Sequence, residues 1–289
     1  MTLQAQATTG SASPAVDDSN GFAISQWHDT DEVMAKLNAL LSQPVRPIRR
    51  ENMDKVLRYF DEKCRGSKRM ADQAKEVIPG GVQHNLAFNY PHPLAITGAN
   101  GAHMTDVDGN RYIDFLQAGG PTILGSNVES VRRHVHELLD SCGPTTGLMH
   151  EYEVKLAELV VEHFPAVDMF RMLGSGTEGV MAAIRVARAH TGKKWIIKIG
   201  GGYHGWSDQM VYGLLVPGTE RRDSVGIPRD CVSHTQESFT HDINAVRRRL
   251  QLNKLRGGTD SVIVEPVGPE SGTRPIYKNF NQELRQLCN

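Results

Sequence analysis

The second half of this 289-residue chain alternates short apolar segments with amphipathic ones, and this alternation constrains the fold more than any other feature. Three apolar segments are typical of strands: Met169–Leu173, Trp195–Ile199 and Ser261–Val264. Two stretches between them carry apolar residues at helical spacing, Thr177–His190 and Asp242–Leu252. Strands that alternate with helices favour a mostly parallel sheet with helices on both faces, so the sequence predicts an α/β fold.

The first half of the chain has a different pattern. The helices and strands expected there are Asp29–Gln43, Met53–Val77, Leu94–Ile96, Ala102–Phe115, Glu129–Leu139 and Val154–Phe164. The turn Asp106–Asn110 lies between extended residues and predicts a β-hairpin. Gly143-Pro144 is expected to end one helix, and the Ala/Ser/Thr/Gln-rich Met1–Asn20 is expected to be a flexible tail.

Charge and composition exclude several classes of protein. The chain has 32 basic and 33 acidic residues, which leave no net field to attract nucleic acid or an anionic membrane surface. No apolar run in the sequence approaches the length of a membrane span. The four cysteines are far apart, so neither a zinc cluster nor a disulfide framework is indicated. We expect a cytoplasmic protein with no nucleic-acid or membrane partner.

A glycine-rich turn, Gly174–Gly179, lies between a predicted strand and a predicted helix. Backbone N–H groups and the positive end of a helix converge at such a turn, and a phosphate is the natural ligand. The hydroxyls of Ser175 and Thr177 flank Gly176 and can add side-chain donors. These three residues therefore form a candidate phosphate site.

Two other interpretations of the turn stay open. Its letters also match the dinucleotide fingerprint G-x-G-x-x-G, which needs an Asp or Glu about 20 residues further on to bind the ribose. The chain has Ile199-Gly200-Gly201-Gly202 at that place, which disfavours a dinucleotide. Alternatively, the glycines serve only tight packing between strand and helix.

Further candidates come at the carboxyl ends of strands, where parallel sheets bind their ligands. Tyr203 and His204 follow Trp195–Ile199 within a run of glycines, and a tyrosine there can stack on a planar aromatic cofactor. Glu265 directly follows Ser261–Val264. The alternatives are a core tyrosine and an exposed loop carboxylate.

Taken in chain order, these motifs resemble those of the class III, fold-type I enzymes that depend on pyridoxal 5′-phosphate (PLP). The matching segments are Ser175-Gly176-Thr177-Glu178, Tyr203-His204-Gly205 and Glu265-Pro266-Val267. Upstream, Ile78–Val82 and Gly101–Phe115 are similar to the N-terminal segment of glutamate-1-semialdehyde aminomutases and their transaminase relatives. The resemblance runs from about Glu51 to the last residue.

The resemblance implies a fold-type I architecture with a mostly parallel sheet flanked by helices. It divides the chain into a partly flexible N-terminal extension (1–50), the N-terminal helix and hairpin segment of a small domain (51–125), and an incomplete PLP-binding large domain (126–289). It also implies a homodimer that moves the amino group of a small amino or oxo acid, by transamination or internal amino transfer, with PLP as cofactor.

Roles carried over from the family fall only on matching residues. Ser175, Gly176 and Thr177 would bind the cofactor phosphate, and Tyr203 would lie over the pyridine ring. His204 belongs to the same loop, and Glu265 matches an acidic residue that lies close to the ring in the family.

Two departures from the family affect catalysis. Where relatives often have an arginine that anchors a substrate carboxylate, this chain has Gln83-His84-Asn85. His84 is a weak candidate to replace that arginine, and an ordinary loop histidine is the alternative. In the family, the aspartate that pairs with the pyridine nitrogen and the Schiff-base lysine lie beyond the point that matches Asn289. We therefore expect a C-terminally truncated, inactive chain with no catalytic residue of its own, or else a non-catalytic partner subunit.

Overall fold

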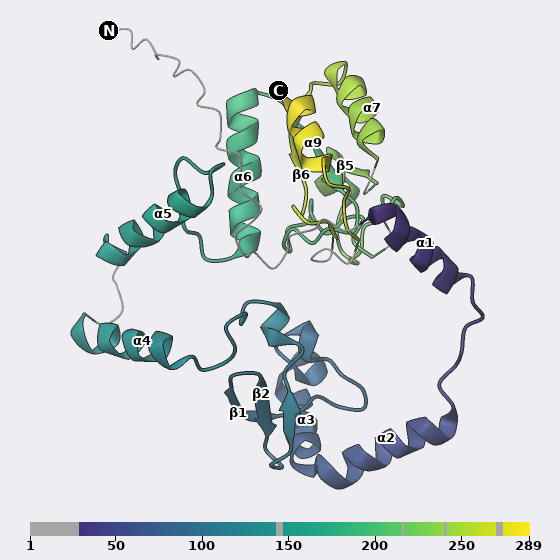
Figure 1. Cartoon of the computed structure of the whole chain (residues 1–289), viewed down its shortest axis with the longest axis vertical. Coiled ribbons are helices and arrows are strands. Elements are labelled where there is room, and N and C mark those ends of the chain that lie inside the picture. Colours follow the sequence, from purple (N-terminus) through teal and green to yellow (C-terminus); the bar gives the residue numbers. More distant parts are fainter. Residues whose placement is uncertain (1–28, 143–146, 216, 240–241, 270–273) are drawn as a thin grey trace. The chain divides into compact units, whose positions relative to one another are not determined.

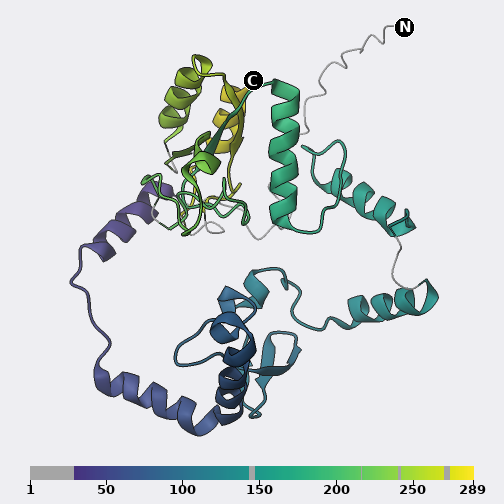
Figure 2. The same ribbon diagram turned by 180° about the vertical axis from the view of Figure 1, so that it is seen from behind.

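A computed structural model describes residues 29–142, 147–215, 217–239, 242–269 and 274–289. The described residues form two compact units, one that contains residues 29–43 and 169–289 and one that contains residues 44–168. Figures 1 and 2 show the elements of both units from opposite sides. The expected tail Met1–Asn20 and the expected helix stop Gly143-Pro144 lie outside the described residues. The domain boundaries at 50/51 and 125/126 stay a prediction.

The unit that includes the C-terminus is built on a parallel sheet. Its strands are β4 (Trp195–Ile199), β5 (Thr235–Ser238) and β6 (Thr259–Ile263), in the order β5-β4-β6. Its helices include α1 (Thr30–Leu41), α6 (Gly176–Thr191), the 3-10 helix η4 (Arg229–Val232), α7 (Ile243–Lys254) and α9 (Phe280–Cys288). The sheet and its flanking helices confirm the predicted fold class.

Helices cover both faces of this sheet, with α6 on one side and α7 and α9 on the other (Figure 1). On the α6 side, Ile196 packs with Ile184 and Met210. On the other side, Ile199 belongs to a second cluster, whose further buried members are Ile243, Val246, Ile276, Phe280 and Leu284. The two clusters arise because successive side chains of a strand point to opposite faces.

One predicted strand, Met169–Leu173, is wrong. These residues form no strand in the structure, and the side chains of Met169 and Met172 are exposed. A strand is held by backbone hydrogen bonds to a neighbour, and within the described residues the sheet consists of β5, β4 and β6 alone. Met169–Leu173 forms no strand because no neighbouring strand of the described residues pairs with it.

The unit of residues 44–168 combines helices with an antiparallel sheet. Its elements are α2 (Arg50–Lys63), α3 (Arg65–Val77), η1 (Pro79–Gly81), η2 (Asn85–Ala87), β1 (Ile96–Asn100), β2 (His103–Asp106), β3 (Arg111–Ile113), η3 (Gln117–Gly119), α4 (Glu129–Ser141) and α5 (Glu151–His163). The predicted hairpin is confirmed as β2 and β3, which pair antiparallel. The predicted helix Met53–Val77 is broken at Cys64 into α2 and α3.

The hairpin turn also fixes the start of α3. The Asp108 carboxylate accepts hydrogen bonds from the backbone N–H of Gly66 at 2.6 Å and of Ser67 at 3.0 Å. A Cβ on Gly66 would lie 2.8 Å from Asp108 Oδ1 and 2.9 Å from Val107 Cγ2, so a larger residue there would displace the Asp108 carboxylate. A side chain of the turn thus satisfies helix donors that otherwise lack a partner.

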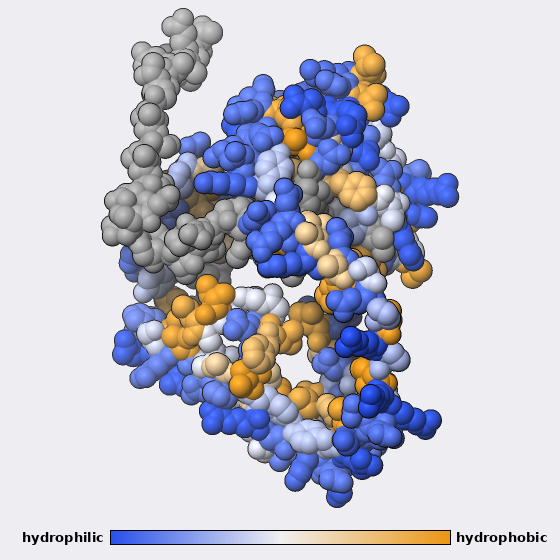
Figure 3. Space-filling model, turned by 45° about the vertical axis from the view of Figure 1, so that its right-hand side comes forward, coloured by the Kyte–Doolittle hydropathy of each residue, from blue (hydrophilic) through white to orange (hydrophobic). Residues whose placement is uncertain are grey.

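Apolar side chains interrupt a mostly hydrophilic surface (Figure 3). Phe115, Ile123, Leu148 and Met149 are among the large apolar residues that are exposed. Within the described ranges, every helix is too short or too polar to cross a bilayer.

Candidate functional site

The glycine-rich turn forms the start of α6, with Ser175 as its N-cap. The Ser175 hydroxyl oxygen accepts the backbone N–H of Glu178 at 3.2 Å and lies 3.2 Å from Glu178 Oε2, to which it donates. This arrangement uses the hydroxyl of Ser175 for the helix cap. The first backbone N–H groups of a helix have no intrahelical acceptor, so those of Gly176 and Thr177 point outward as donors for an anion.

The loop after β4 packs directly against this helix start. The Thr177 hydroxyl oxygen accepts the backbone N–H of Trp206 at 3.0 Å. Gly205 has φ +95°, and a Cβ there would lie 2.7 Å from the Cα of Thr177. Only glycine fits this contact, and the Thr177 hydroxyl proton remains available to donate to a ligand.

Glu265 connects the end of β6 to the same loop. Its Oε1 accepts the backbone N–H of Tyr203 at 3.0 Å, and a Cβ on Gly202 would lie 3.4 Å from that oxygen. The structure therefore brings the three sequence motifs together at the carboxyl edge of the parallel sheet, where α/β proteins bind ligands.

The two neighbouring side chains of this loop differ sharply in exposure. Tyr203 is 63% exposed, whereas His204 is 8% exposed. Burial, helped by the nearby Lys198 ammonium, lowers the pKa of His204 from 6.5 to about 4, against the opposing Glu265 carboxylate. The imidazole is therefore neutral at neutral pH. Its Nε2 is buried without a hydrogen-bond partner in the described part of the chain.

His84, the candidate for a substrate carboxylate, lies in the unit of residues 44–168. It is exposed, and its Nδ1 accepts the backbone N–H of Leu86 at 3.1 Å as the N-cap of η2. Its local role in the structure is thus a helix cap. The six candidates Ser175, Gly176, Thr177, Tyr203, His204 and Glu265 all lie in the unit with the parallel sheet.

Sequence reasoning missed two buried charged residues beneath the loop. Lys198 of β4 is fully buried, and Glu237 of β5 is 1% exposed. Burial lowers the pKa of Lys198 to about 8, although the carboxylates of Glu237, Asp223 and Glu265 oppose this shift. A charged residue within an apolar parallel strand is the signal that could have identified Lys198, because such strands are buried on both faces.

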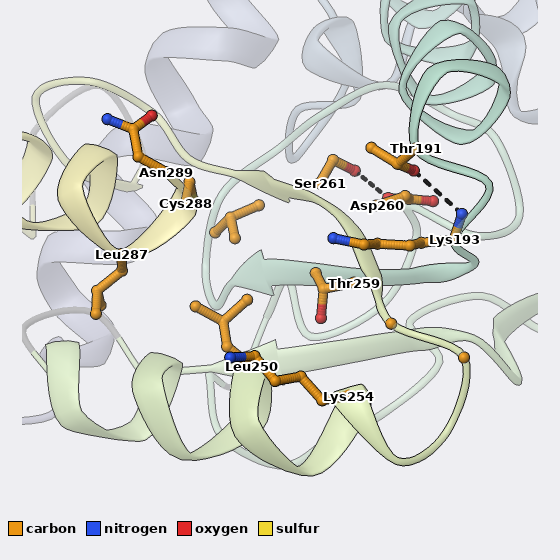
Figure 4. Close-up of a pocket in the computed structure, with 13 residues that line it drawn as sticks. Thr191, Lys193, Leu250, Lys254, Thr259, Asp260, Ser261, Leu287, Cys288 and Asn289 are labelled. Atoms are coloured by element: carbon orange, nitrogen blue, oxygen red, sulfur yellow. Dashed lines mark hydrogen bonds between the residues drawn. The ribbon is translucent and has the colours of Figure 1, made fainter.

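A separate cavity of about 530 Å³ lies at the opposite edge of the sheet, near the amino ends of β4 and β6. Figure 4 shows Lys193, Lys254 and Leu250 among its lining side chains. None of the candidate cofactor residues contributes to this lining. The described residues also contain no cluster of three or more His, Cys, Asp or Glu side chains that could hold a metal ion.

The chain belongs to the class III aminotransferases. The family model for aminotransferase class III matches residues 86–289. Two curated relatives are both named glutamate-1-semialdehyde 2,1-aminomutase. That of Acetivibrio thermocellus is 41% identical over 229 residues, which cover 77% of this chain and 52% of the relative. That of Lachnoclostridium phytofermentans, numbered 1, is 40% identical over 230 residues, with coverages of 77% and 53%.

Solved structures agree with this assignment of fold. An omega-transaminase from Sphaerobacter thermophilus superposes with a TM-score of 0.73 at 28% identity, over 79% of this chain and 53% of that one. A β-phenylalanine aminotransferase from Variovorax paradoxus gives a TM-score of 0.71 at 26% identity, with coverages of 82% and 52%. The chain thus spans about half the length of the relatives it matches. Class III aminotransferases have the PLP fold type I and depend on PLP.

The residues present fit this cofactor. The start of α6 offers backbone donors and one hydroxyl to a phosphate, and the exposed Tyr203 ring offers a stacking surface beside it. The loop that carries Tyr203 is joined to the helix start through Trp206 and Thr177, so both features lie at one edge of the sheet.

Proposed function

We propose that this chain binds PLP at the carboxyl edge of its parallel sheet. The backbone N–H groups of Gly176 and Thr177 and the Thr177 hydroxyl would hold the phosphate, and Tyr203 would stack on the ring. The observation that carries the proposal is the contact between Trp206 N–H and Thr177 Oγ1, because it holds the tyrosine loop against the helix start.

Each remaining candidate has a role in this proposal. Ser175 caps α6 and so orients the outward-pointing N–H donors. Glu265 holds the backbone of Tyr203 at 3.0 Å, and His204 fills the space below the loop as a neutral ring. Bound PLP would supply the electron sink for amino-group chemistry, while these side chains bind, orient and exclude water.

The activity of the whole protein is proposed from the same family. We infer a PLP-dependent transfer of an amino group on a small amino or oxo acid, as an aminotransferase or a 2,1-aminomutase. Relatives that are 40% and 41% identical carry the aminomutase name, which supports this class of reaction. A homodimer in the cytoplasm, and a carboxylate contact from His84, are the finer parts of the same proposal.

The test uses pyridoxamine 5′-phosphate in place of PLP. The aldehyde of PLP forms imines with surface lysines, whereas the amino group of pyridoxamine 5′-phosphate cannot. Calorimetric titration of the 289-residue chain should detect binding of this compound, and weaker binding of pyridoxamine, which lacks the phosphate. A hydrogen bond to a charged group contributes about 1.5–3 kcal/mol, so Thr177→Ala should weaken binding of the phosphate compound about tenfold or more. Its effect on pyridoxamine should be smaller, because that compound has no phosphate to lose and is weakened only through the shifted Tyr203 loop.

Thr191→Ala is the matched control, because Thr191 lies at the other end of α6 and donates its hydroxyl to the Ala187 carbonyl at 2.8 Å. NAD is the control ligand for the dinucleotide alternative. Tighter binding of NAD than of pyridoxamine 5′-phosphate would overturn the proposal. Equal affinities of the wild type and Thr177→Ala, in folded proteins, would also refute it.

A further inference from the structure

A buried carboxylate lies directly below the loop that carries Tyr203. Glu237 is in β5 and is 1% exposed, and it lies in register with the fully buried Lys198 of β4. Neighbouring residues in register on adjacent strands project to the same face of a sheet. Two opposite charges are thus buried side by side near the carboxyl ends of these strands.

The Glu237 carboxylate accepts hydrogen bonds from two backbone N–H groups of the segment 217–220. Its Oε1 accepts the N–H of Gly218 at 2.5 Å, and its Oε2 accepts the N–H of Glu220 at 2.8 Å. A Cβ on Gly213 would lie 2.5 Å from the carboxylate carbon, and a Cβ on Gly200 would clash with Oε1. The carboxylate therefore fits into a cradle that two glycines leave open.

The segment around this carboxylate is joined to the glycine loop that precedes Tyr203. The Gly213 carbonyl accepts the N–H of Gly201 at 2.8 Å, and the Gly200 N–H donates to the Ser238 carbonyl at 2.8 Å. Gly201 has φ +84°, a backbone conformation that strains any other residue. The backbone path of Gly200–Gly202 is thus set by hydrogen bonds to Gly213, which packs against the Glu237 carboxylate, and to Ser238, which follows Glu237 in β5.

Lys198 supports the same segment from β4. Its Nζ donates to the Tyr212 carbonyl at 2.5 Å, one residue before Gly213. Asp223 Oδ2 accepts the N–H of Leu214 at 2.7 Å on the other side of Gly213. Buried charges are costly unless they are compensated, and here they are satisfied largely by loop backbone groups.

We propose that Glu237 and Lys198 are positioning residues for the PLP site: they fix the backbone at Tyr212–Leu214 and at Gly218–Glu220, which in turn fixes Gly200–Gly202 and so the place of the Tyr203 ring. This inference rests on the proposed function, since it assigns a purpose to the position of Tyr203. Neither side chain needs to touch the cofactor for this role.

The experiment compares Glu237→Leu, Glu237→Gln and the double variant Lys198→Met/Glu237→Leu with the wild type. Removing Glu237 alone leaves the buried Lys198 ammonium without a neighbouring carboxylate, whereas the double variant removes both charges. A loop shift seen in both variants is therefore not caused by an uncompensated charge but by the lost contacts with the loop backbone. Asp230→Asn is the control, because Asp230 is an exposed carboxylate of η4 in the same unit.

Two readouts are needed. Hydrogen exchange followed by mass spectrometry should show faster exchange in peptides from 200–205 and 213–220 of both leucine-containing variants, with the peptide 180–190 of α6 unchanged. The affinity for pyridoxamine 5′-phosphate should fall about fivefold in the same variants, which is the scale of a lost ring stack. Glu237→Gln keeps one carbonyl acceptor and should recover part of both losses.

The outcomes separate this inference from the proposed function. If the wild type binds pyridoxamine 5′-phosphate and a folded double variant binds it equally well, the positioning role is refuted and the proposed function stands. Faster exchange spread evenly over the whole unit refutes it too, because the effect is then general destabilisation. If the wild type binds none of the compound, the proposed function fails, and unchanged exchange at 200–205 in the double variant then overturns the inference.

Discussion

Replacing Gly205 by alanine tests whether the tyrosine loop must lie against the start of α6. Gly205 has φ +95°, and its added Cβ would lie 2.7 Å from the Thr177 Cα and 2.8 Å from its hydroxyl oxygen. Both contacts are shorter than side-chain carbons tolerate, and the Cα belongs to the helix backbone. The loop must therefore move away, and the Trp206 N–H would lose its acceptor on Thr177.

The expected cost has two parts. A left-handed backbone costs a residue other than glycine about 1–2 kcal/mol. Forcing an extra methyl group into a filled space costs about 1–3 kcal/mol more. Gly205→Ala should therefore lower the free energy of unfolding by about 2–5 kcal/mol.

Gly226→Ala is the control that isolates the second part. Gly226 has φ +86°, close to that of Gly205, but a Cβ there would meet no atom within 4 Å. Urea unfolding followed by circular dichroism should give a cost of only about 1–2 kcal/mol for this variant. Affinity for pyridoxamine 5′-phosphate should fall in Gly205→Ala and stay at the wild-type value in Gly226→Ala. Equal costs of unfolding in the two variants would refute the close contact between loop and helix.

Three further predictions concern single side chains of the site. Because the folded pKa of His204 is about 4 and its ordinary value is 6.5, the unfolded chain binds more protons in this window. As pH falls from 6.5 to about 4, the free energy of unfolding of the wild type should therefore decrease by about 3 kcal/mol more than that of His204→Asn. Parallel pH profiles of the two proteins in urea titrations would contradict this. Ser175→Ala should lower the unfolding free energy by about 1 kcal/mol yet weaken pyridoxamine 5′-phosphate binding less than Thr177→Ala, because its hydroxyl serves the helix cap; calorimetry showing the reverse order would make Ser175 the main phosphate ligand. Tyr203→Phe should keep the ligand affinity and Tyr203→Ala should lose about two- to tenfold, whereas similar affinities would exclude stacking.

The fold of the sheet unit was largely predictable from residue types. Trp195–Ile199 was placed with the bounds that β4 has, since its aliphatic run is flanked by lysines and glycines. The start of α6 followed from Ser175 and the glycines around it. Met169–Leu173 failed as a strand because its apolar letters carry no information about whether a neighbouring strand is present.

The missed features depend on tertiary contacts. The strand β5 has the sequence Thr-Gln-Glu-Ser, which shows no apolar alternation, so its residue types do not predict a strand. Glu237 can be buried there because loop N–H groups, rather than water, satisfy its carboxylate. The role of Ser175 as a helix cap was also not visible, since a serine at this position can donate to a phosphate or accept from the helix. Only the observed contact with Glu178 distinguishes the two roles in this structure.

The hydrogen bonds that connect the motifs distinguish two kinds of residue: those that hold the site together and those whose side chains are free to contact a ligand. Trp206 and Tyr203 donate through their backbone N–H groups, across 29 and 62 residues of sequence, to side chains of Thr177 and Glu265. A backbone donor does not depend on the side chain that it accompanies, except for proline. These two hydrogen bonds therefore require an acceptor side chain at positions 177 and 265. The aromatic side chains at 203 and 206 take no part in them and remain exposed. Substituting Thr177 or Glu265 should disturb loop position and ligand affinity together, whereas substituting the ring of Tyr203 should change affinity alone.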